Sequence, residues 1–193
     1  MQVGVLALQG DWEAHIAALR AAGIAAEPVR TAAALDRVGA LVMPGGESTA
    51  MLRLMADEGL AERIGGRVRS GMPVLATCAG VILLAAGVEP RQPSLGLLDI
   101  DVVRNAYGRQ VHSAVSTIDV NGELGDPRQM EAVFIRAPRI VRTGADVAVL
   151  GRRRGDPVLV RSGRIVAATF HPELSADRRV HALFLGLLED SDA

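Results

Sequence analysis

The sequence predicts an α/β protein built on a doubly wound, mostly parallel sheet to which antiparallel strands are added. Apolar runs alternate with helical segments in the first part of the chain, and the first run, Val3–Leu8, is continuous. Such runs are typical of strands buried on both faces of a parallel sheet. After Gly87 the pattern changes to short strands separated by Gly, Asp and Pro, which indicates antiparallel hairpins.

The first part of the chain predicts four strands and the helices between them. The strands are expected at Val3–Leu8, Ala26–Val29, Ala40–Met43 and Val74–Ala76. A helix is expected at Asp11–Ala22, with Asp11 as N-cap and Gly23 just past its end. Further helical segments are expected at Leu35–Val38, from Ser48 to about Ser70 with breaks near Gly59 and Gly65-Gly66, and at Ala79–Ala86.

The second part predicts six strands and a closing helix. The strands are expected at Leu98–Val103, Ala114–Val120, Ala132–Ile135, Ala148–Arg152, Pro157–Arg161 and Arg164–Thr169, and the helix at about Ala176–Glu189. The sequence contains no repeat, low-complexity tract or linker. We therefore expect residues 1–193 to form a single domain.

Composition excludes several classes of function. The formal net charge of −1 gives no indication of a nucleic-acid or membrane partner, and the start lacks the pattern of a signal peptide, so we expect a cytoplasmic protein. A single cysteine rules out an internal disulfide and a cysteine-based zinc site. All 21 basic residues are arginine, which excludes a Schiff-base lysine, a P-loop lysine and a Ser-Lys dyad. We expect neither a metal nor an organic cofactor.

Cys78 lies where an apolar strand runs into a turn of small residues and then a helix. This pattern resembles a nucleophile elbow with sulfur in place of a hydroxyl. A helix N-terminus favours the thiolate, and the amide of Ala79 can face a developing oxyanion. The segment alone leaves open whether Cys78 is instead an ordinary buried cysteine.

His171 and Glu173 strengthen the catalytic interpretation of Cys78. They follow the strand that ends at Phe170, and residues two apart in an extended segment point the same way. A thiolate nucleophile needs a base, and the base needs an acceptor that orients it. The combination favours catalysis over a structural histidine.

A glycine pair ends the third predicted strand, at Pro44-Gly45-Gly46. Glycines permit close backbone approach, and the Gly46 amide could complete an oxyanion hole with that of Ala79. Glu47 or Ser48 could instead simply cap the helix that follows.

These segments resemble the glutaminase subunits of pyridoxal 5′-phosphate synthase, which are class I glutamine amidotransferases. The motifs that carry the resemblance occur in family order along almost the whole chain: Leu8-Gln9-Gly10 with Glu13-Ala14-His15, Pro44-Gly45-Gly46-Glu47-Ser48-Thr49, Thr77-Cys78-Ala79-Gly80, Arg104-Asn105 with Gly108-Arg109-Gln110, Phe134-Ile135-Arg136-Ala137-Pro138, and Phe170-His171-Pro172-Glu173-Leu174. The resemblance implies a flavodoxin-like, doubly wound fold. It also implies a partner synthase subunit, because this chain has no region for making a pyridine ring.

The resemblance implies a role for each matching residue. Cys78 would attack the side-chain amide of glutamine, His171 would act as base and then as acid, and Glu173 would orient His171. The implied glutamine-contacting positions are Gly46, Glu47, Ser48, Arg104, Ile135 and Arg136. Arginine suits the α-carboxylate of free glutamine, although Arg104 and Arg136 taken alone are as well explained by surface ion pairs.

The resemblance also implies regulation by the partner. A synthase that presses on the first loop and on the helix carrying Glu13 and His15 could reorient an amide of the glycine loop. Glu13 and His15 would then be docking residues; the alternative is that both are ordinary exposed helix positions.

Other classes of function remain open at this stage. A cysteine-elbow hydrolase or redox-sensing protein of flavodoxin-like fold would also place a cysteine after a strand. Such proteins usually lack the late His-x-Glu pair. A non-enzymatic binding module would not explain why Cys78, Gly45-Gly46 and His171 all fall at strand ends. A glutaminase subunit of another pathway, such as histidine biosynthesis, is disfavoured by the segment from Arg104 to Gln110.

Overall fold

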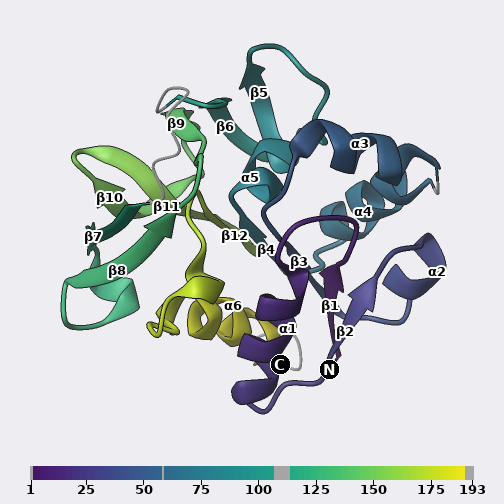
Figure 1. Cartoon of the computed structure of the whole chain (residues 1–193), viewed down its shortest axis with the longest axis horizontal. Helices are drawn as coiled ribbons and strands as arrows, with labels where there is room; N and C mark the ends of the chain where they lie inside the picture. Colours follow the sequence, from purple (N-terminus) through teal and green to yellow (C-terminus); the bar gives the residue numbers. More distant parts are fainter. Residues whose placement is uncertain (1, 58, 107–113, 190–193) are drawn as a thin grey trace.

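A nine-stranded mixed sheet forms the centre of the protein in the computed structural model, which describes residues 2–57, 59–106 and 114–189 (Figure 1). Its parallel half contains, in spatial order, β2 (Ala26–Val29), β1 (Val3–Leu6), β3 (Ala40–Met43), β4 (Val74–Thr77) and β12 (Ile165–Ala168). Numbered by their succession in this half, the strands have the order 2-1-3-4-5, which is that of flavodoxin-like sheets. The predicted fold class is confirmed.

Four antiparallel strands extend the sheet beyond β12. They are β11 (Asp156–Ser162), β10 (Ala148–Arg153), β7 (Ala114–Val120) and β8 (Gln129–Phe134). A second sheet of three strands contains β5 (Ala85–Glu89), β6 (Leu98–Val103) and β9 (Arg139–Thr143). The change to hairpins that the sequence predicts after Gly87 is therefore present.

Helices cover both faces of the parallel half. On one face lie α1 (Trp12–Ala21) and α6 (Arg179–Glu189), and on the other lie α2 (Ala32–Leu35), α3 (Ser48–Asp57), α4 (Leu60–Arg69) and α5 (Ala79–Leu84). Two short 3-10 turns complete the set, η1 (Gly122–Leu124) and η2 (Pro172–Leu174). No helix in the described ranges has the length and apolar character needed to cross a membrane.

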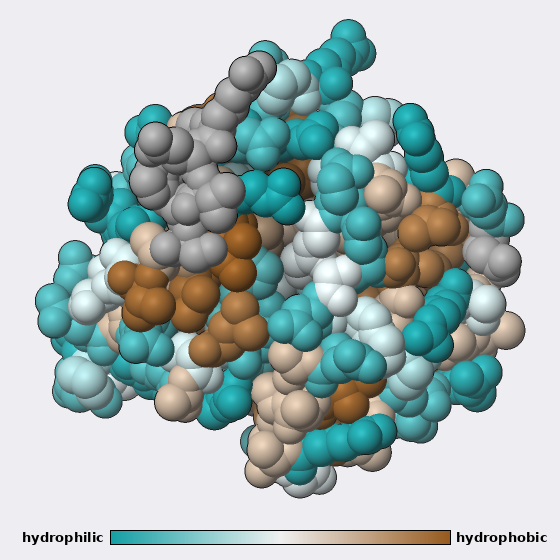
Figure 2. Space-filling view, in the orientation of Figure 1, coloured by the Kyte–Doolittle hydropathy of each residue, from teal (hydrophilic) through white to brown (hydrophobic). Residues whose placement is uncertain are grey.

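Alternation along the strands divides the core into two layers. In β3, Ala40 and Val42 pack with the layer of α1 and α6, whereas Leu41 and Met43 pack with that of α3, α4 and α5. The strands read as continuous apolar runs because both faces of the sheet are covered in this way. Figure 2 shows that the outer surface is mostly hydrophilic, with one apolar area on the side where β8 lies in Figure 1 and another on the side of α3 and α4.

Several predicted boundaries in the helices are wrong. The segment from Ser48 breaks near Gly59 as expected, but Gly65-Gly66 lies inside α4. There Leu60 and Ile64 are fully buried, and their packing outweighs the low helix propensity of glycine. The first helical turn after β2 comes earlier than predicted, and the helix after Cys78 ends at Leu84, because the chain becomes β5 at Ala85.

The sequence analysis also misses β9, which has an arginine at its first and fourth positions and only two apolar residues between them. Arg142 lies 2.6 Å from carboxylate oxygens of both Asp99 and Asp101, which lie on the paired strand β6. These cross-strand ion pairs explain how such a charged segment forms a strand.

Glycine is required where α5 crosses the end of β3. A Cβ atom built on Gly80 would lie 2.1 Å from the carbonyl oxygen of Met43. No side chain can relieve this clash, because the obstacle is backbone. The turn after β4 therefore packs directly against the end of the neighbouring strand.

We predict that Gly80→Ala lowers the free energy of unfolding by about 1–3 kcal/mol, which is the usual cost of overpacking a core. Gly66→Ala is the matched control, because nothing lies within 4 Å of a Cβ at this helical position. Helix propensity predicts that the control gains up to about 1 kcal/mol. Urea unfolding of the two variants measures both effects, and equal stabilities would contradict the packing argument.

Candidate active site

Cys78 lies in the turn between β4 and α5, at the carboxyl end of a central strand. Its backbone has φ +48° and ψ −105°, a conformation that costs a non-glycine residue about 1–3 kcal/mol. Its amide donates to the carbonyl oxygen of Ala168 in β12 at 2.9 Å, and its Sγ lies 3.7 Å from the carbonyl oxygen of Ile135. The strained turn thus has the strand–turn–helix geometry expected from the sequence.

His171 and Glu173 meet at the end of the adjacent strand. His171 follows β12, and Glu173 lies in η2, which begins at Pro172. The Nδ1 atom of His171 is 2.7 Å from Oε1 of Glu173, and both residues are buried. Because Nδ1 is bound to Glu173, Nε2 is the nitrogen that remains able to exchange a proton with other groups. Within the described ranges this buried Nε2 has no hydrogen-bond partner.

The electrostatics of the pair favour a charged imidazole. Burial lowers the pKa of His171, but its interactions with Cys78 and Glu173 outweigh burial and raise the pKa to about 10. Burial likewise raises the pKa of Glu173, but hydrogen bonds from His15 and His171 hold this pKa well below its usual range. A protonated imidazole between a sulfur and a carboxylate is an arrangement found in cysteine nucleophiles.

The glycine loop after β3 forms a wall beside these three residues. A Cβ atom on Gly45 would lie 2.5 Å from Cε1 of His171 and 3.3 Å from Cβ of Cys78. Gly46 has φ +150°, which other residues rarely adopt. Only glycine at position 45 lets the backbone come this close to His171.

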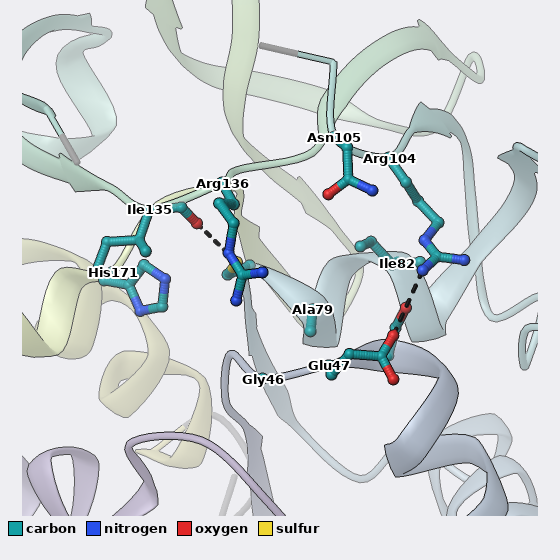
Figure 3. Close-up of a pocket in the computed structure, with 11 residues that line it drawn as sticks. Gly46, Glu47, Ala79, Ile82, Arg104, Asn105, Ile135, Arg136 and His171 are labelled. Carbon is teal, nitrogen blue, oxygen red and sulfur yellow. Dashed lines mark hydrogen bonds and ion pairs between the residues drawn. The ribbon is translucent and has the colours of Figure 1, made fainter. Parts of the chain in front are cut away.

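A pocket of about 200 Å³ opens over Cys78. It is lined by Gly46, Glu47, Ser48, Cys78, Ala79, Ile82, Arg104, Asn105, Ile135, Arg136 and His171. In Figure 3, His171 and Ile135 lie on one side, Glu47, Arg104 and Asn105 lie on the other, and Arg136 extends between them. The volume is below the roughly 300–1,000 Å³ of pockets for drug-sized ligands and suits a smaller molecule.

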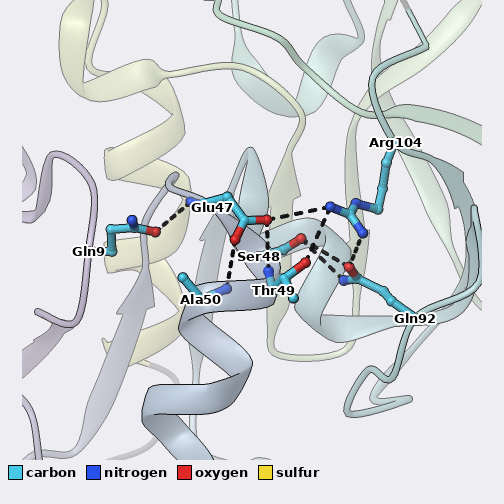
Figure 4. A network of polar contacts seen from close by, with 7 residues as sticks. All are labelled: Gln9, Glu47, Ser48, Thr49, Ala50, Gln92 and Arg104. Carbon is cyan, nitrogen blue, oxygen red and sulfur yellow. Dashed lines mark hydrogen bonds and ion pairs between the residues drawn. The ribbon is translucent and has the colours of Figure 1, made fainter.

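Glu47 links the helix start to the pocket. Its two carboxylate oxygens accept from the amides of Thr49 and Ala50 at 3.0 and 2.8 Å, so the capping role considered for this residue is present (Figure 4). Burial raises the pKa of Glu47, but these amides and Arg104 together lower it below its usual value. Glu47 therefore presents a negative charge at the rim of the pocket.

Arg104 lies opposite Glu47, with Nη2 at 3.5 Å from Oε1 (Figure 4). Its Nη1 atom also donates to Oε1 of Gln92, and the Gln92 amide contacts Oγ of Ser48 at 3.2 Å. The ion pair that the sequence analysis considers for Arg104 is thus present. It lies inside the pocket rather than on an unrelated part of the surface.

The first loop contacts the glycine loop directly. A Cβ on Gly10 would lie 1.9 Å from the carbonyl oxygen of Gly45, and Oε1 of Gln9 accepts from the amide of Glu47 at 2.7 Å. The two loops therefore pack backbone against backbone. A displacement of the first loop would reach the residues that line the pocket.

All the predicted site residues line this pocket except Glu173, which contacts His171 from behind. The sequence analysis missed Ile82 and Gln92 altogether. Ile82 could have been found, because it lies one helical turn after Cys78. Asn105 occurs in a motif of the family resemblance but received no role. The remainder of that motif, Gly108-Arg109-Gln110, lies outside the described residues.

His15 overturns one expectation. It is neither a docking residue nor an exposed helix position, because it is fully buried and its Nε2 atom lies 3.1 Å from Oε2 of Glu173. It occupies the inner face of α1, whereas Glu13 on the same helix is exposed. The sequence analysis treated the two residues alike, although residues two apart on a helix point about 200° apart around its axis and cannot share one face.

Comparison with known proteins identifies similar chains over the full length. The model of a family described as the SNO glutamine amidotransferase family matches residues 5–190. A protein of Thermotoga neapolitana named pyridoxal 5′-phosphate synthase subunit PdxT is 47% identical over 190 residues, which cover 98% of this chain and 100% of the relative. A protein of the same name from Mycolicibacterium vanbaalenii is 52% identical over 193 residues, covering 97% of each chain.

Solved structures agree with this result. One described as a glutamine amidotransferase superposes with a TM-score of 0.90 at 44% identity, covering 98% of this chain and 100% of the other. The structure of PurLQS from Thermotoga maritima superposes with a TM-score of 0.71 at 18% identity, covering 97% and 98%. The second likeness shows the shared fold alone.

We predict that Cys78→Ala lowers the pKa of His171 from its value of about 10, because the contact with Cys78 is one of the causes that raise it. The imidazole should then lose its proton at a lower pH than in the unmodified protein. NMR titration of the imidazoles can follow this change, since the chain has only 4 histidines.

His181 is the internal control for this titration. Burial is the largest of the causes that lower its pKa to about 4, and Cys78 is not among them. Its titration should not move in the variant. An unchanged pKa of His171 would show that Cys78 and His171 do not interact.

Proposed function

This chain belongs to the SNO glutamine amidotransferase family, and on that premise we propose that Cys78, His171 and Glu173 hydrolyse glutamine to glutamate and ammonia for a pyridoxal 5′-phosphate synthase partner. One observation carries the proposal. A strained cysteine and a histidine held by a buried carboxylate lie at the ends of adjacent strands β4 and β12, in one pocket. The names of the two relatives support the pathway and the partner.

The first half of the reaction forms a glutamyl thioester. The thiolate of Cys78 attacks the side-chain carbonyl carbon of glutamine, and the oxygen becomes an oxyanion facing the amides of Gly46 and Ala79. His171 then donates the proton on Nε2 to the leaving nitrogen, and ammonia departs. Glu173 holds the imidazole in the orientation that points Nε2 at the reacting atoms.

The second half releases glutamate. A water molecule gives a proton to Nε2 of His171 and attacks the thioester carbon, and the same amides stabilise the second oxyanion. Collapse of this intermediate expels the thiolate of Cys78 and restores the protonated imidazole. Each proton that His171 gives in the first half is thus recovered in the second.

Charge in the pocket supports free glutamine as the substrate. Glutamine carries an α-ammonium and an α-carboxylate, and the wall opposite His171 offers the Glu47 carboxylate and the Arg104 guanidinium. The Glu47 carboxylate suits the α-ammonium of glutamine, and the Arg104 guanidinium suits its α-carboxylate. Arg136, at the exposed end of β8, offers a second guanidinium. Binding would replace the contact between Glu47 and Arg104 with contacts to the substrate.

Contacts between the loops support control by the partner. Ammonia released without an acceptor is wasted, so a coupled glutaminase benefits from a site that is completed only in the complex. The first loop contacts the glycine loop through Gly10 and through the bond from Gln9 to the Glu47 amide. A partner that displaces the first loop would therefore move the proposed oxyanion amide of Gly46.

We predict that Cys78→Ala abolishes glutamine hydrolysis in the complex and leaves the melting temperature close to that of the unmodified protein. A glutamine-analogue electrophile such as diazo-oxo-norleucine should label Cys78 alone, which mass spectrometry can verify. His171→Ala should lose more activity than Glu173→Ala, because loss of the base costs more than loss of the residue that orients it. Substantial hydrolysis by the alanine variant at position 78 would refute the proposed mechanism.

We predict that adding the synthase subunit raises the rate of glutamine hydrolysis until the two subunits are near equimolar. Gln9→Ala, which removes the side-chain bond to the glycine loop, should change the rate of the free chain relative to that of the complex. Thr31→Ala is the control, because Thr31 caps α2 away from the pocket. A rate that is equally high without the partner would contradict this gating.

A further inference from the structure

A buried pair of histidines lies behind the proposed catalytic carboxylate. His15 of α1 and His181 of α6 are 0% and 2% exposed, and their rings meet with Nδ1 of His15 at 3.3 Å from Nε2 of His181. The Nε2 atom of His15 lies 3.1 Å from Oε2 of Glu173. The mechanism described above uses neither histidine.

A histidine nitrogen therefore lies close to each carboxylate oxygen of Glu173. His171 lies at 2.7 Å from Oε1, and His15 lies at 3.1 Å from Oε2. A buried carboxylate is costly unless its oxygens are paired, and two partners fix its plane where one would leave it free to rotate. The orientation of His171 depends on this plane.

His15 also contacts the residue that precedes the nucleophile. Its Nε2 atom is 3.2 Å from Oγ1 of Thr77, the last residue of β4. The same nitrogen thus lies between the strand that carries Cys78 and the carboxylate that serves His171. Few positions in the molecule could align both halves of the site at once.

The hydrogen bonds can be assigned a direction. Glu173 is ionised and only accepts, so a proton on Nε2 of His15 suits its Oε2 atom at 3.1 Å, while the hydrogen bond of that nitrogen is made with Oγ1 of Thr77 at 3.2 Å. With its proton on Nε2, His15 accepts at Nδ1, which requires Nε2 of His181 to donate. This leaves Nδ1 of His181 as a bare lone pair, and that atom is buried with no hydrogen-bond partner among the described residues. An unpaired acceptor is tolerated better than an unpaired N–H.

The protonation state of His181 agrees with donation from its Nε2 atom to His15. Burial is the main cause that lowers the pKa of His181, to about 4, so it is neutral near neutral pH and has one N–H to donate. The protons then follow one direction, from Nε2 of His181 to His15 and from Nε2 of His15 toward Thr77 and the nearby Glu173.

We propose that His15 is a positioning residue for the catalytic site: it holds a protonated Nε2 between Thr77 and the Oε2 atom of Glu173, is fixed in that tautomer by His181, and acts on the reaction only through Glu173. The proposal rests on the function proposed above, in which Glu173 orients His171. The competing explanation is that the two histidines only fill the space between α1, α6 and the sheet.

The tautomers provide a test that needs no activity. In the unmodified protein, long-range ¹H–¹⁵N NMR of the 4 imidazoles should show His15 and His181 both neutral and both protonated at Nε2. His15→Gln and His181→Gln variants assign the signals. A Nδ1-protonated or doubly protonated His15 would overturn the proposed direction.

Kinetics in the complex with the synthase subunit provide the second test. His15→Leu removes the donor and keeps a similar volume, and it should lower kcat by about 10–100-fold, the usual cost of losing a residue that orients a catalytic ligand, with KM within about twofold. His15→Gln can place an N–H near the position of Nε2 and should recover most of the loss. Equal activity of the two variants would favour the space-filling explanation.

Ile16→Val is the control for disturbance of the helix. Ile16 is the next residue of α1 and is 6% exposed, within the apolar layer of α1 and α6. It should lower the melting temperature without changing kcat. A fall in kcat as large as that of His15→Leu would show that any disturbance of α1 inhibits, and would overturn the proposal.

A double-mutant cycle separates this proposal from the proposed function. If His15 acts through Glu173, His15→Leu should have no further effect on kcat in a Glu173→Ala background. Loss of activity in Glu173→Ala together with full activity in His15→Leu would overturn only the role of His15. Full activity in Glu173→Ala would overturn the role of Glu173 in the proposed function itself.

Discussion

The parallel pairing of β4 with β12 is the constraint on which the site depends. Thr77 pairs with Ala168, so the chain leaves both strands at the same level of the sheet. Cys78 comes one residue later on one strand and His171 three residues later on the other. The bond from the Cys78 amide to the Ala168 carbonyl holds the strained turn against β12. A shift of the pairing by one residue would turn the side chains of the displaced strand to the opposite face and separate the two.

Close backbone approach is the second requirement, and it explains the three glycines around the site. At Gly10, Gly45 and Gly80, a Cβ would lie within 2.5 Å of another atom, and at two of these positions the obstacle is a carbonyl oxygen. The loops after β1, β3 and β4 can therefore stack at one edge of the sheet. Side chains at these positions would hold the loops apart and enlarge the pocket.

The fold and the pocket could be predicted from the sequence, but the surroundings of Glu173 could not. Continuous apolar strands and the positions of Cys78, Gly46 and His171 at strand ends identify the sheet and the edge where the site lies. The match to a glutamine amidotransferase family confirms the resemblance drawn from the motifs and favours it over a redox-sensing protein. In contrast, His15 and His181 lie 166 residues apart, and no local pattern indicates that they meet.

The two faces of the sheet contribute different chemistry to the pocket. The groups suited to the charged ends of a substrate, Glu47 and Arg104, lie with α3 and the strands β5 and β6, on the face that packs against α5. The groups that hold Glu173 come from α1 and α6 on the opposite face. Cys78 lies between them at the sheet edge. The two sets thus reach the pocket from opposite faces of the sheet, and the bond between Gln9 and the Glu47 amide connects the loop before α1 to the first set.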